Sequence, residues 1–288
     1  MISWMKKKLR NILGVKNIKI LLAAERFFKR FNVEISNGDI IKLRKIRKDF
    51  PQVLNTKETL DFIIKNNASI CRFGDAEFDI CNNKNKDDPY QKPSEKLTER
   101  LSDIVKTERG DGLLICIPPF NYATNNIKNF HGSLSFWEWY WLSRYEEIKN
   151  LIVRNSYGNS FVTRESVFYE NELKEIQKIW DGRDVVFVYG GSGRFKVNSI
   201  IFNNIKSYKE IVIKPTDAFS DYDEILEKCR FFEKDVLFMV AAGPTATVLS
   251  YDLWKEGYQA LDVGHLPNSY DEFLGDIISP ENIPLINN

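Results

Sequence analysis

The sequence predicts an α/β protein in which a mostly parallel sheet is covered by helices on both faces, with a basic helical arm in front of it. Short apolar runs alternate with amphipathic stretches from about Thr56 onward, and a repeated strand-then-helix order favours a parallel sheet. The 288 residues include 20 Phe, 12 Tyr and 6 Trp, enough bulk for a substantial core. We therefore expect the arm at residues 1–50 and one domain at residues 51–288.

The expected elements follow from periodicity and from their boundary residues. Strands are short apolar runs ended by glycine or proline, as at Gly74 and Pro118, and helices carry an apolar stripe and a capping residue, as at Ser94. Helices are expected at residues 2–31, Thr56–Ile64, Ser94–Lys106, Leu134–Ile148 and Ser166–Trp180. Strands are expected at Ser69–Phe73, Leu113–Ile117, Phe161–Thr163, Asp184–Tyr189, Ile211–Ile213, Val236–Val240 and Gln259–Asp262.

The arm differs in charge from the rest of the chain. Residues 1–50 hold 14 Lys and Arg against 4 Asp and Glu. A basic amphipathic helix of this kind either lies on an anionic membrane surface or packs on the main domain or a partner. Its longest apolar run, Ile20 to Ala24, is far too short to cross a bilayer, and Lys16 and Lys19 interrupt any signal-peptide core. We expect a cytoplasmic protein, peripheral at the inner face of the cell membrane if the arm binds lipid.

Four scattered cysteines fit the same compartment. They show no CxxC pair and no ligand-like spacing, which favours buried, reduced thiols over a zinc site or disulfides. The chain also contains no pattern typical of a catalytic Ser/His/Asp triad or of a nucleic-acid module, so no nucleic-acid partner is expected.

The sharpest local feature is an acidic pair directly after a predicted strand. Asp75 and Glu77 stand two residues apart and point to one side if the backbone stays extended. Two hard oxygen ligands can hold Mn²⁺ or Mg²⁺ and leave positions for diphosphate oxygens, with Arg72 as a cationic neighbour. The alternative is a solvated loop, because this spacing is common.

A glycine-rich turn follows the predicted strand Asp184–Tyr189. Gly191 and Gly193 in such a turn, ahead of a helix, expose backbone N–H groups to phosphate, and Arg194 adds positive charge. The turn lacks the dinucleotide spacing and the P-loop Lys-Ser/Thr pair. A tight turn that needs glycine backbone angles explains it equally well.

Other candidates stand at the ends of predicted strands. Arg164 follows one strand and is a phosphate ligand by chemistry. Small residues from Ala241 precede Pro244, and such strand-end loops line ligand crevices in parallel sheets. His265 follows Asp262 at the last strand and is either a metal ligand or general base, or a structural turn residue. The tryptophans near 137–141 are expected in the core, with sugar stacking on an exposed ring as the alternative.

Taken in order, these motifs resemble the GT-D glycosyltransferases, formerly domain of unknown function 1792, of bacterial surface-glycan and glycoprotein pathways. The resemblance covers about residues 52–275 and rests on four separated segments: Ser69–Glu77, Gly190–Phe195, Pro215–Leu226 and Gly243–His265. It implies a Rossmann-like domain that transfers a hexose from a UDP-sugar, with a divalent metal at the D-x-E motif. Relatives usually carry Gly between the two acids, where this chain has Ala76.

The resemblance assigns roles to the candidates. Asp75 and Glu77 are the expected metal and diphosphate site, with Arg72, Arg194 and His265 as members of the same site. From their own chemistry, Gly74, Arg164, Gly191 and Gly193 are also expected around the diphosphate. Glu77 or His265 is the expected base for the acceptor hydroxyl of a glycan, glycoprotein or lipid-linked acceptor. The alternative from another class is a non-catalytic nucleotide-sugar or glycan-binding protein on the same fold. A dehydrogenase or methyltransferase is disfavoured by the late, irregular glycine turn.

Overall fold

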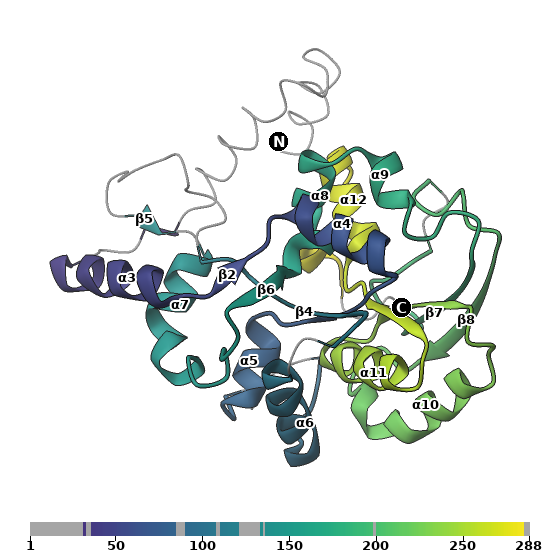
Figure 1. Cartoon of the computed structure of the whole chain (residues 1–288), viewed down its shortest axis with the longest axis horizontal. Coiled ribbons are helices and arrows are strands. Elements are labelled where there is room, and N and C mark those ends of the chain that lie inside the picture. The colour runs from purple at the N-terminus through teal and green to yellow at the C-terminus, as the bar shows by residue number, and fades with distance from the viewer. Residues whose placement is uncertain are drawn as a thin grey trace, which may run out of the picture.

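An eight-stranded parallel sheet forms the centre of the protein (Figure 1). The computed structural model describes residues 31–32, 36–84, 90–107, 110–120, 133–134, 136–197 and 200–284. In spatial order the strands are β2 (Gln52–Val53), β6 (Ser156–Asn159), β4 (Leu113–Ile117), β3 (Ser69–Arg72), β10 (Gln259–Asp262), β9 (Leu237–Ala241), β7 (Asp184–Gly190) and β8 (Ser207–Ile213). The predicted parallel α/β class is confirmed.

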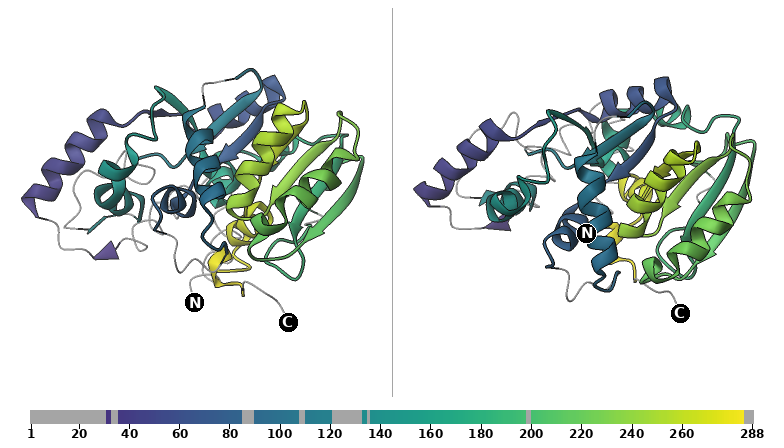
Figure 2. Two further views of the ribbon diagram at one scale, coloured as in Figure 1. Left: turned by 90° about the horizontal axis from the view of Figure 1, so that it is seen from below. Right: turned by 60° about the horizontal axis from the view of Figure 1, so that its bottom comes forward.

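Helices cover both faces of this sheet (Figure 2). The helices are α3 (Asn37–Asp49), α4 (Thr56–Asn66), α5 (Asp75–Cys81), α6 (Glu95–Lys106), α7 (Phe136–Ile148), α8 (Glu165–Glu170), α9 (Leu173–Gln177), α10 (Tyr222–Arg230), α11 (Pro244–Lys255) and α12 (Leu266–Leu274). Short 3-10 turns occupy Ser160–Thr163, Ala218–Asp221 and Pro280–Asn282.

Each face of the sheet has its own hydrophobic core. Trp141 of α7 and Phe238 of β9 are fully buried on the face that α6, α10 and α11 cover. Trp180 and Phe187 are buried on the opposite face, against α4, α8 and α12. Burying one such side chain is worth about 1.5–3 kcal/mol. Two cores built this way hold the strand ends, and the loops that follow them, in fixed positions.

Local sequence explains why several helices begin where they do. Ser94 caps α6 by accepting a hydrogen bond from the Leu97 N–H at 3.3 Å. Asn55 caps α4 in a capping box with Glu58, and such caps satisfy backbone donors that otherwise lack partners. Both helices match their predicted starts within one residue.

Three expected elements are corrected by the structure. Residues Phe161–Thr163 are part of a 3-10 turn, and the strand of that region is Ser156–Asn159. The helix expected at Ser166–Trp180 is two short helices, α8 and α9, because the chain is extended at Asn171 and Glu172. No helix follows β7 before β8 in the described residues, although the glycine-rich turn predicted one.

The arm is described only in part. Residues 1–30, where most of the expected amphipathic helix falls, lie outside the described residues. The described part contains α3, which projects from the body (Figure 2), and strand β1 (Phe31–Asn32), which pairs antiparallel with β5 (Ser133–Leu134). Within the described ranges, no helix combines the length and apolar character needed to traverse a bilayer.

Candidate functional site

A cavity of about 800 Å³ opens where β3, β10, β9 and β7 end. This edge of the sheet holds the point where strand order reverses between β3 and β10, the usual ligand crevice of open parallel sheets. Most of the predicted site residues line the cavity, namely Arg72, Gly74, Asp75, Glu77, Arg164, Gly193, Arg194 and His265. Gly191 does not line it.

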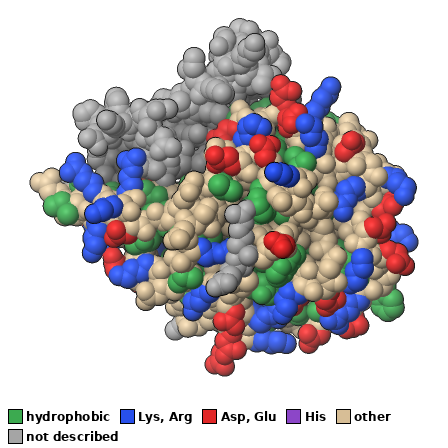
Figure 3. Space-filling view, viewed as in Figure 1, with side chains coloured by type: hydrophobic (Ala, Val, Ile, Leu, Met, Phe, Trp, Pro, Cys, Tyr) green, Lys and Arg blue, Asp and Glu red, His purple; other side chains and the backbone are tan. Residues whose placement is uncertain are grey.

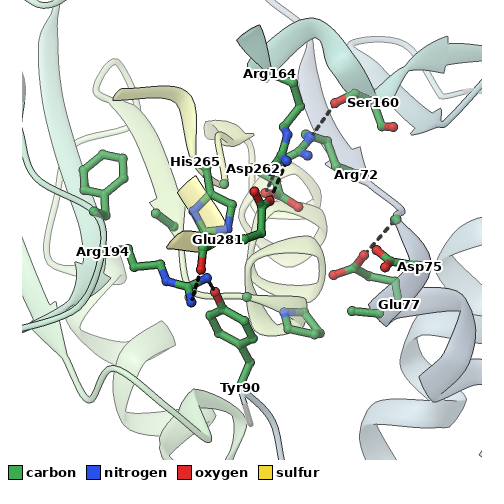
Figure 4. A pocket seen from close by; sticks show the side chains of 18 of the residues that line it. Arg72, Asp75, Glu77, Tyr90, Ser160, Arg164, Arg194, Asp262, His265 and Glu281 are labelled. Carbon is green, nitrogen blue, oxygen red and sulfur yellow. Dashed lines mark hydrogen bonds and ion pairs between the residues drawn. The ribbon is translucent and has the colours of Figure 1, made fainter. Parts of the chain in front are cut away.

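The acidic pair lies at the start of α5, which corrects the extended backbone that we expected there. Asp75 is the first residue of the helix and is accessible from the cavity, while Glu77 is half-buried. The Glu77 Oε2 accepts a hydrogen bond from the Gly74 N–H at 2.7 Å, the return half of a capping box. Figure 4 shows the two carboxylates side by side at one end of the cavity.

The charges around the pair favour binding of a cation. Burial raises the pKa of Glu77 to about 8, with further contributions from the negative charges of Asp262 and Asp75. Burial also raises the pKa of Asp75. Burial and the neighbouring carboxylates disfavour the charged form of this pair, and a divalent ion beside it would offset that penalty.

The donor set fits a divalent metal that also binds diphosphate. The described residues contain no group of three or more His, Cys, Asp and Glu side chains placed to hold a metal ion. Mg²⁺-type sites commonly use one or two carboxylates and complete their coordination with substrate phosphates and water. Asp75 and Glu77 match that arrangement.

Arg72 lies beside the acids at the end of β3 and is held from two sides. Its Nη1 is 3.5 Å from Asp262 Oδ1, and its Nε donates to the Ser160 carbonyl at 2.9 Å. The Thr247 hydroxyl donates a hydrogen bond to Asp262 Oδ2 at 3.0 Å. Gly264 permits this arrangement, since a Cβ at that position would lie 2.3 Å from Arg72 Nη1. The guanidinium is thus fixed between the end of β10 and the turn that follows β6.

Arg194 occupies the opposite side of the cavity (Figure 4). Its Nη1 hydrogen-bonds the Tyr90 hydroxyl, and its guanidinium carbon is 5.1 Å from the centre of the Tyr90 ring. Its Nε donates to the Ile283 carbonyl at 2.7 Å. Through these hydrogen bonds Arg194 holds residues 281–283 against this side of the cavity.

Arg164 and His265 share the space between these two ends. Arg164 Nη2 forms an ion pair with Glu281 Oε1 at 2.6 Å. Burial, and then the charge of Arg164, lower the pKa of His265, so the imidazole is neutral at physiological pH. A neutral imidazole has a nitrogen free to accept a proton or hydrogen bond.

The glycine-rich turn after β7 is shaped by packing. A Cβ on Gly191 would lie 2.6 Å from Val212 Cγ1, and one on Gly193 would lie 2.8 Å from the Gly190 carbonyl oxygen. The strand–turn–helix arrangement that we predicted here occurs instead at β9 and α11, where Gly243 has a φ of 57° and Pro244 starts the helix. The N-terminus of α11 lines the cavity and offers backbone N–H groups to anions.

Three functional candidates were missing from the predicted set: Tyr90, Asp262 and Glu281. Asp262 stood within a quoted motif, and its position at the end of a predicted strand is the feature that could have singled it out. Tyr90 and Glu281 reach the cavity from segments with no recognisable motif. Only the tertiary fold brings them to Arg194 and Arg164.

Comparisons with known proteins agree with this architecture. The family model described as "Glycosyltransferase GT-D fold" matches residues 70–285. A solved structure titled "The highly conserved domain of unknown function 1792 has a distinct glycosyltransferase fold" is 31% identical, with a TM-score of 0.74 over 86% of this chain and 88% of that one. Another, titled "A New Glycosyltransferase (DUF1792) from Streptococcus sanguinis", is 28% identical with a TM-score of 0.69, covering 82% of this chain and 88% of that one.

Two curated relatives are longer proteins. "Glycosyltransferase GlyD" of Streptococcus pneumoniae serotype 4 (strain ATCC BAA-334 / TIGR4) is 31% identical over 229 residues, which are 77% of this chain and 28% of that protein. "Probable glycosyl transferase Gly" of Streptococcus gordonii is 28% identical over 227 residues, 77% of this chain and 33% of that protein. The chain thus spans about a third of these relatives or less. With the family model matching most of its length and the sheet and cavity described above, this chain belongs to the GT-D-fold glycosyltransferase family.

Proposed function

We propose that this protein is a metal-dependent glycosyltransferase that moves a hexose from a UDP-sugar to a hydroxyl of a glycan, glycoprotein or lipid-linked acceptor in bacterial surface-polysaccharide synthesis. The observation that carries the proposal is the joint placement of Asp75 and Glu77 with Arg72, Arg164 and Arg194 in one cavity. The family supports the reaction class, and the charges in the cavity support a donor that contains a diphosphate.

Asp75 and Glu77 would hold a Mn²⁺ or Mg²⁺ ion, which when bound would neutralise the charge that develops on the departing UDP. Asp75 presents its carboxylate to the cavity, and Glu77 keeps one oxygen on the Gly74 N–H. The Glu77 Oε1 is the oxygen left for the ion.

The cationic side chains would bind the diphosphate. Arg72 is preorganised by Asp262 and by the Ser160 carbonyl, so little entropy is lost when it contacts phosphate. Arg164 and Arg194 provide planar donor groups suited to phosphate oxygens. In the structure Arg164 is paired with Glu281, and the diphosphate would compete with that carboxylate.

Transfer also requires that the acceptor hydroxyl lose its proton as it attacks the anomeric carbon. The two candidate bases are Glu77 and His265, both of which line the cavity. Figure 4 places Glu77 beside Asp75 and His265 near Arg194. Transfer by His265→Gln with saturating donor tests the choice, since loss of the base lowers turnover while UDP still binds. Unchanged turnover in His265→Gln would leave Glu77 as the base.

The experiment that tests the proposal is UDP release from a panel of UDP-sugars by the purified protein, with Mn²⁺ or with a chelator. Many transferases slowly hydrolyse their donor without an acceptor, so the panel identifies the sugar. We expect release that needs the metal and is lost in Asp75→Asn and Glu77→Gln. No release from any donor, with UDP still bound, would instead support a non-catalytic nucleotide-sugar-binding protein.

We also propose that the basic arm contacts an anionic membrane surface at the inner face of the cell membrane. Lys and Arg side chains gather over α3 (Figure 3). Ile41, Arg44, Lys45 and Lys48 recur at helical spacing on the face opposite buried Ile46, and Ile41 is 67% exposed. Each such cation stabilises binding to an anionic lipid surface by about 1 kcal/mol. The exposed side chain of Ile41 would insert between the lipid headgroups.

A further inference from the structure

One end of the cavity is aromatic. Phe136 and Trp137 from the start of α7, and Phe161 from the turn after β6, all line it. The Trp137 ring centre is 5.8 Å from that of Phe161 and 5.1 Å from that of Phe136. All three side chains are half-buried, so part of each ring faces the cavity. We call these three residues the aromatic wall.

The aromatic wall is held firmly against the helix that carries the acidic pair. Trp137 is backed by Tyr140 and by fully buried Trp141, at ring-centre distances of 5.4 Å and 6.1 Å. The Tyr140 hydroxyl lies 3.3 Å from the Asp75 carbonyl oxygen and 3.1 Å from Asp79 Oδ1. The rings therefore have a fixed position next to Asp75.

Polar groups flank the wall on its cavity side. Asp79 of α5 and Lys84 both line the cavity, and their side chains are 29% and 33% exposed. Flat rings beside a few hydrogen-bonding groups suit a ligand with an apolar face and polar edges. A pyranose has that character, because its C–H bonds form one face and its hydroxyls form the rim.

Position separates this end from Arg194 and from the start of α11. Arg194 lies across the cavity from Asp75 and Glu77 (Figure 4), and the start of α11 also lines the cavity. Arg72 and Arg164 lie between, beside the turn that carries Phe161, where Arg72 donates to the Ser160 carbonyl and the Arg164 N–H donates to the Phe161 carbonyl. Those cations and backbone N–H groups favour the anionic part of a donor. The wall is bordered by the Asp79 carboxylate and the Lys84 ammonium, which respectively accept hydrogen bonds from hydroxyl groups and donate hydrogen bonds to them.

We propose that the aromatic wall is the acceptor subsite, where Phe136, Trp137 and Phe161 stack on a neutral pyranose and Asp79 and Lys84 bind its hydroxyls. This inference rests on the proposed function and names the acceptor class for the same site. The stacked sugar would present a hydroxyl to the anomeric carbon of a donor held at Asp75 and Glu77. The acceptor residue is then a neutral sugar, not an acidic sugar or a protein side chain.

The test compares Trp137→Leu with Trp139→Leu. Trp139 lies on the same helix and is 40% exposed, but it does not line the cavity, so its variant controls for changes to α7. Binding of methyl β-glucopyranoside, methyl β-galactopyranoside and methyl N-acetyl-β-glucosaminide is measured by saturation-transfer NMR. Calorimetry of UDP and donor hydrolysis without acceptor are measured on the same proteins, and Trp137→Phe tests rescue by a smaller ring.

We expect at least one neutral glycoside to bind the wild type, Trp139→Leu and Trp137→Phe. Trp137→Leu should weaken that binding about tenfold, raise the acceptor KM in transfer assays, and leave UDP binding and donor hydrolysis unchanged. Equal glycoside binding by Trp137→Leu and the wild type, or no binding of any glycoside, would overturn the inference. Loss of UDP binding in Trp137→Leu would place the nucleobase on the wall instead. Failure of the proposed function would appear separately, as absent donor hydrolysis in the wild type.

Discussion

The Glu77 carboxylate makes a structural hydrogen bond and is also a proposed metal ligand. Its Oε2 accepts the hydrogen bond from the Gly74 N–H at the start of α5, while its burial among Asp262 and Asp75 raises its pKa to about 8. A group that is neutral in the free protein and anionic beside a cation couples metal binding to proton release. The residue thus links the local stability of α5 to the occupancy of the cavity.

This pKa shift predicts how stability depends on pH. Folding raises the pKa of Glu77 from its ordinary value of 4.5 to about 8, so the native state binds the extra proton between these values. The free energy of unfolding of the metal-free protein therefore falls as pH rises through this window. Glu77→Gln should remove that part of the dependence while keeping the cap, because Gln also accepts a hydrogen bond at this position.

Urea unfolding in the presence of a chelator, at about pH 5.5 and about pH 8.5, measures the effect. The wild type should lose more unfolding free energy between the two values than Glu77→Gln does. Identical losses in both proteins would mean that Glu77 is already ionised in the free protein at the lower pH.

The sequence identified individual residues better than it identified their geometry. Asp75, Glu77 and the three arginines were identified because they are charged residues located at or just after the ends of predicted strands. Their relative positions were not predictable, since the acidic pair was read as extended although Gly74 and Glu77 form the cap of a helix. Tyr90 and Glu281 were missed because only tertiary contacts with Arg194 and Arg164 place them in the cavity.

At the scale of elements, the turn after β10 sets the position of Arg72. Gly264 has a φ of 47°, and a Cβ there would collide with Arg72 Nη1. Gly257 has a φ of 87° but nothing within 4 Å of its Cβ position. Alanine at either site carries the backbone penalty of a left-handed residue, about 1–2 kcal/mol. Only Gly264→Ala should also displace the guanidinium from Asp262.

We therefore expect Gly264→Ala to lose more unfolding free energy than Gly257→Ala, because it also breaks the buried Arg72–Asp262 pair, and only Gly264→Ala to bind UDP more weakly. Thermal unfolding and calorimetry on the two proteins provide the comparison. Equal UDP affinity in both would show that the position of Arg72 does not matter for the ligand.

Helix α3 carries a separate prediction about the membrane. Reversing the charges of Arg44, Lys45 and Lys48 to Glu should abolish flotation of the full chain with vesicles that contain about one-third phosphatidylserine, because each cation contributes about 1 kcal/mol. Lys57→Glu, Lys65→Glu and Lys96→Glu are the matched control, a set of exposed cations on α4 and α6. Unchanged flotation after reversal on α3 would assign the helix to packing or to a protein partner.

The mispredicted strand near residue 160 has its physical cause in packing against a neighbouring strand. Ser156–Asn159 is a polar stretch that becomes a buried strand only because Gly158 packs against Leu114 and Cys116 of β4. The following apolar residues, Phe161–Thr163, looked more strand-like from composition alone. Strands with strong apolar runs, such as Leu113–Ile117, were predicted with their observed bounds, because their own residues are apolar enough to indicate burial.

For the whole molecule, strand order creates the site. Residues 69–159 build β3, β4 and β6 outward from the centre, while residues 237–262 place β9 and β10 on the other side of β3. The sequence predicted the parallel class but not this order, because pairing between strands such as Ile70 and Leu261 spans most of the chain. The cavity at the reversal point is what brings the acids and the arginines together.

The central claim is that a divalent cation held by Asp75 and Glu77 binds the diphosphate of the donor in this cavity. Calorimetric titration of the full chain with UDP, in Mn²⁺ and in a chelator, tests it most directly. Asp61→Asn, an exposed acid on α4, is the matched control for Asp75→Asn and Glu77→Gln. The account predicts metal-dependent UDP binding by the wild type and Asp61→Asn, lost in both site variants. Equal UDP affinity with the chelator, or in the site variants with Mn²⁺, would contradict it.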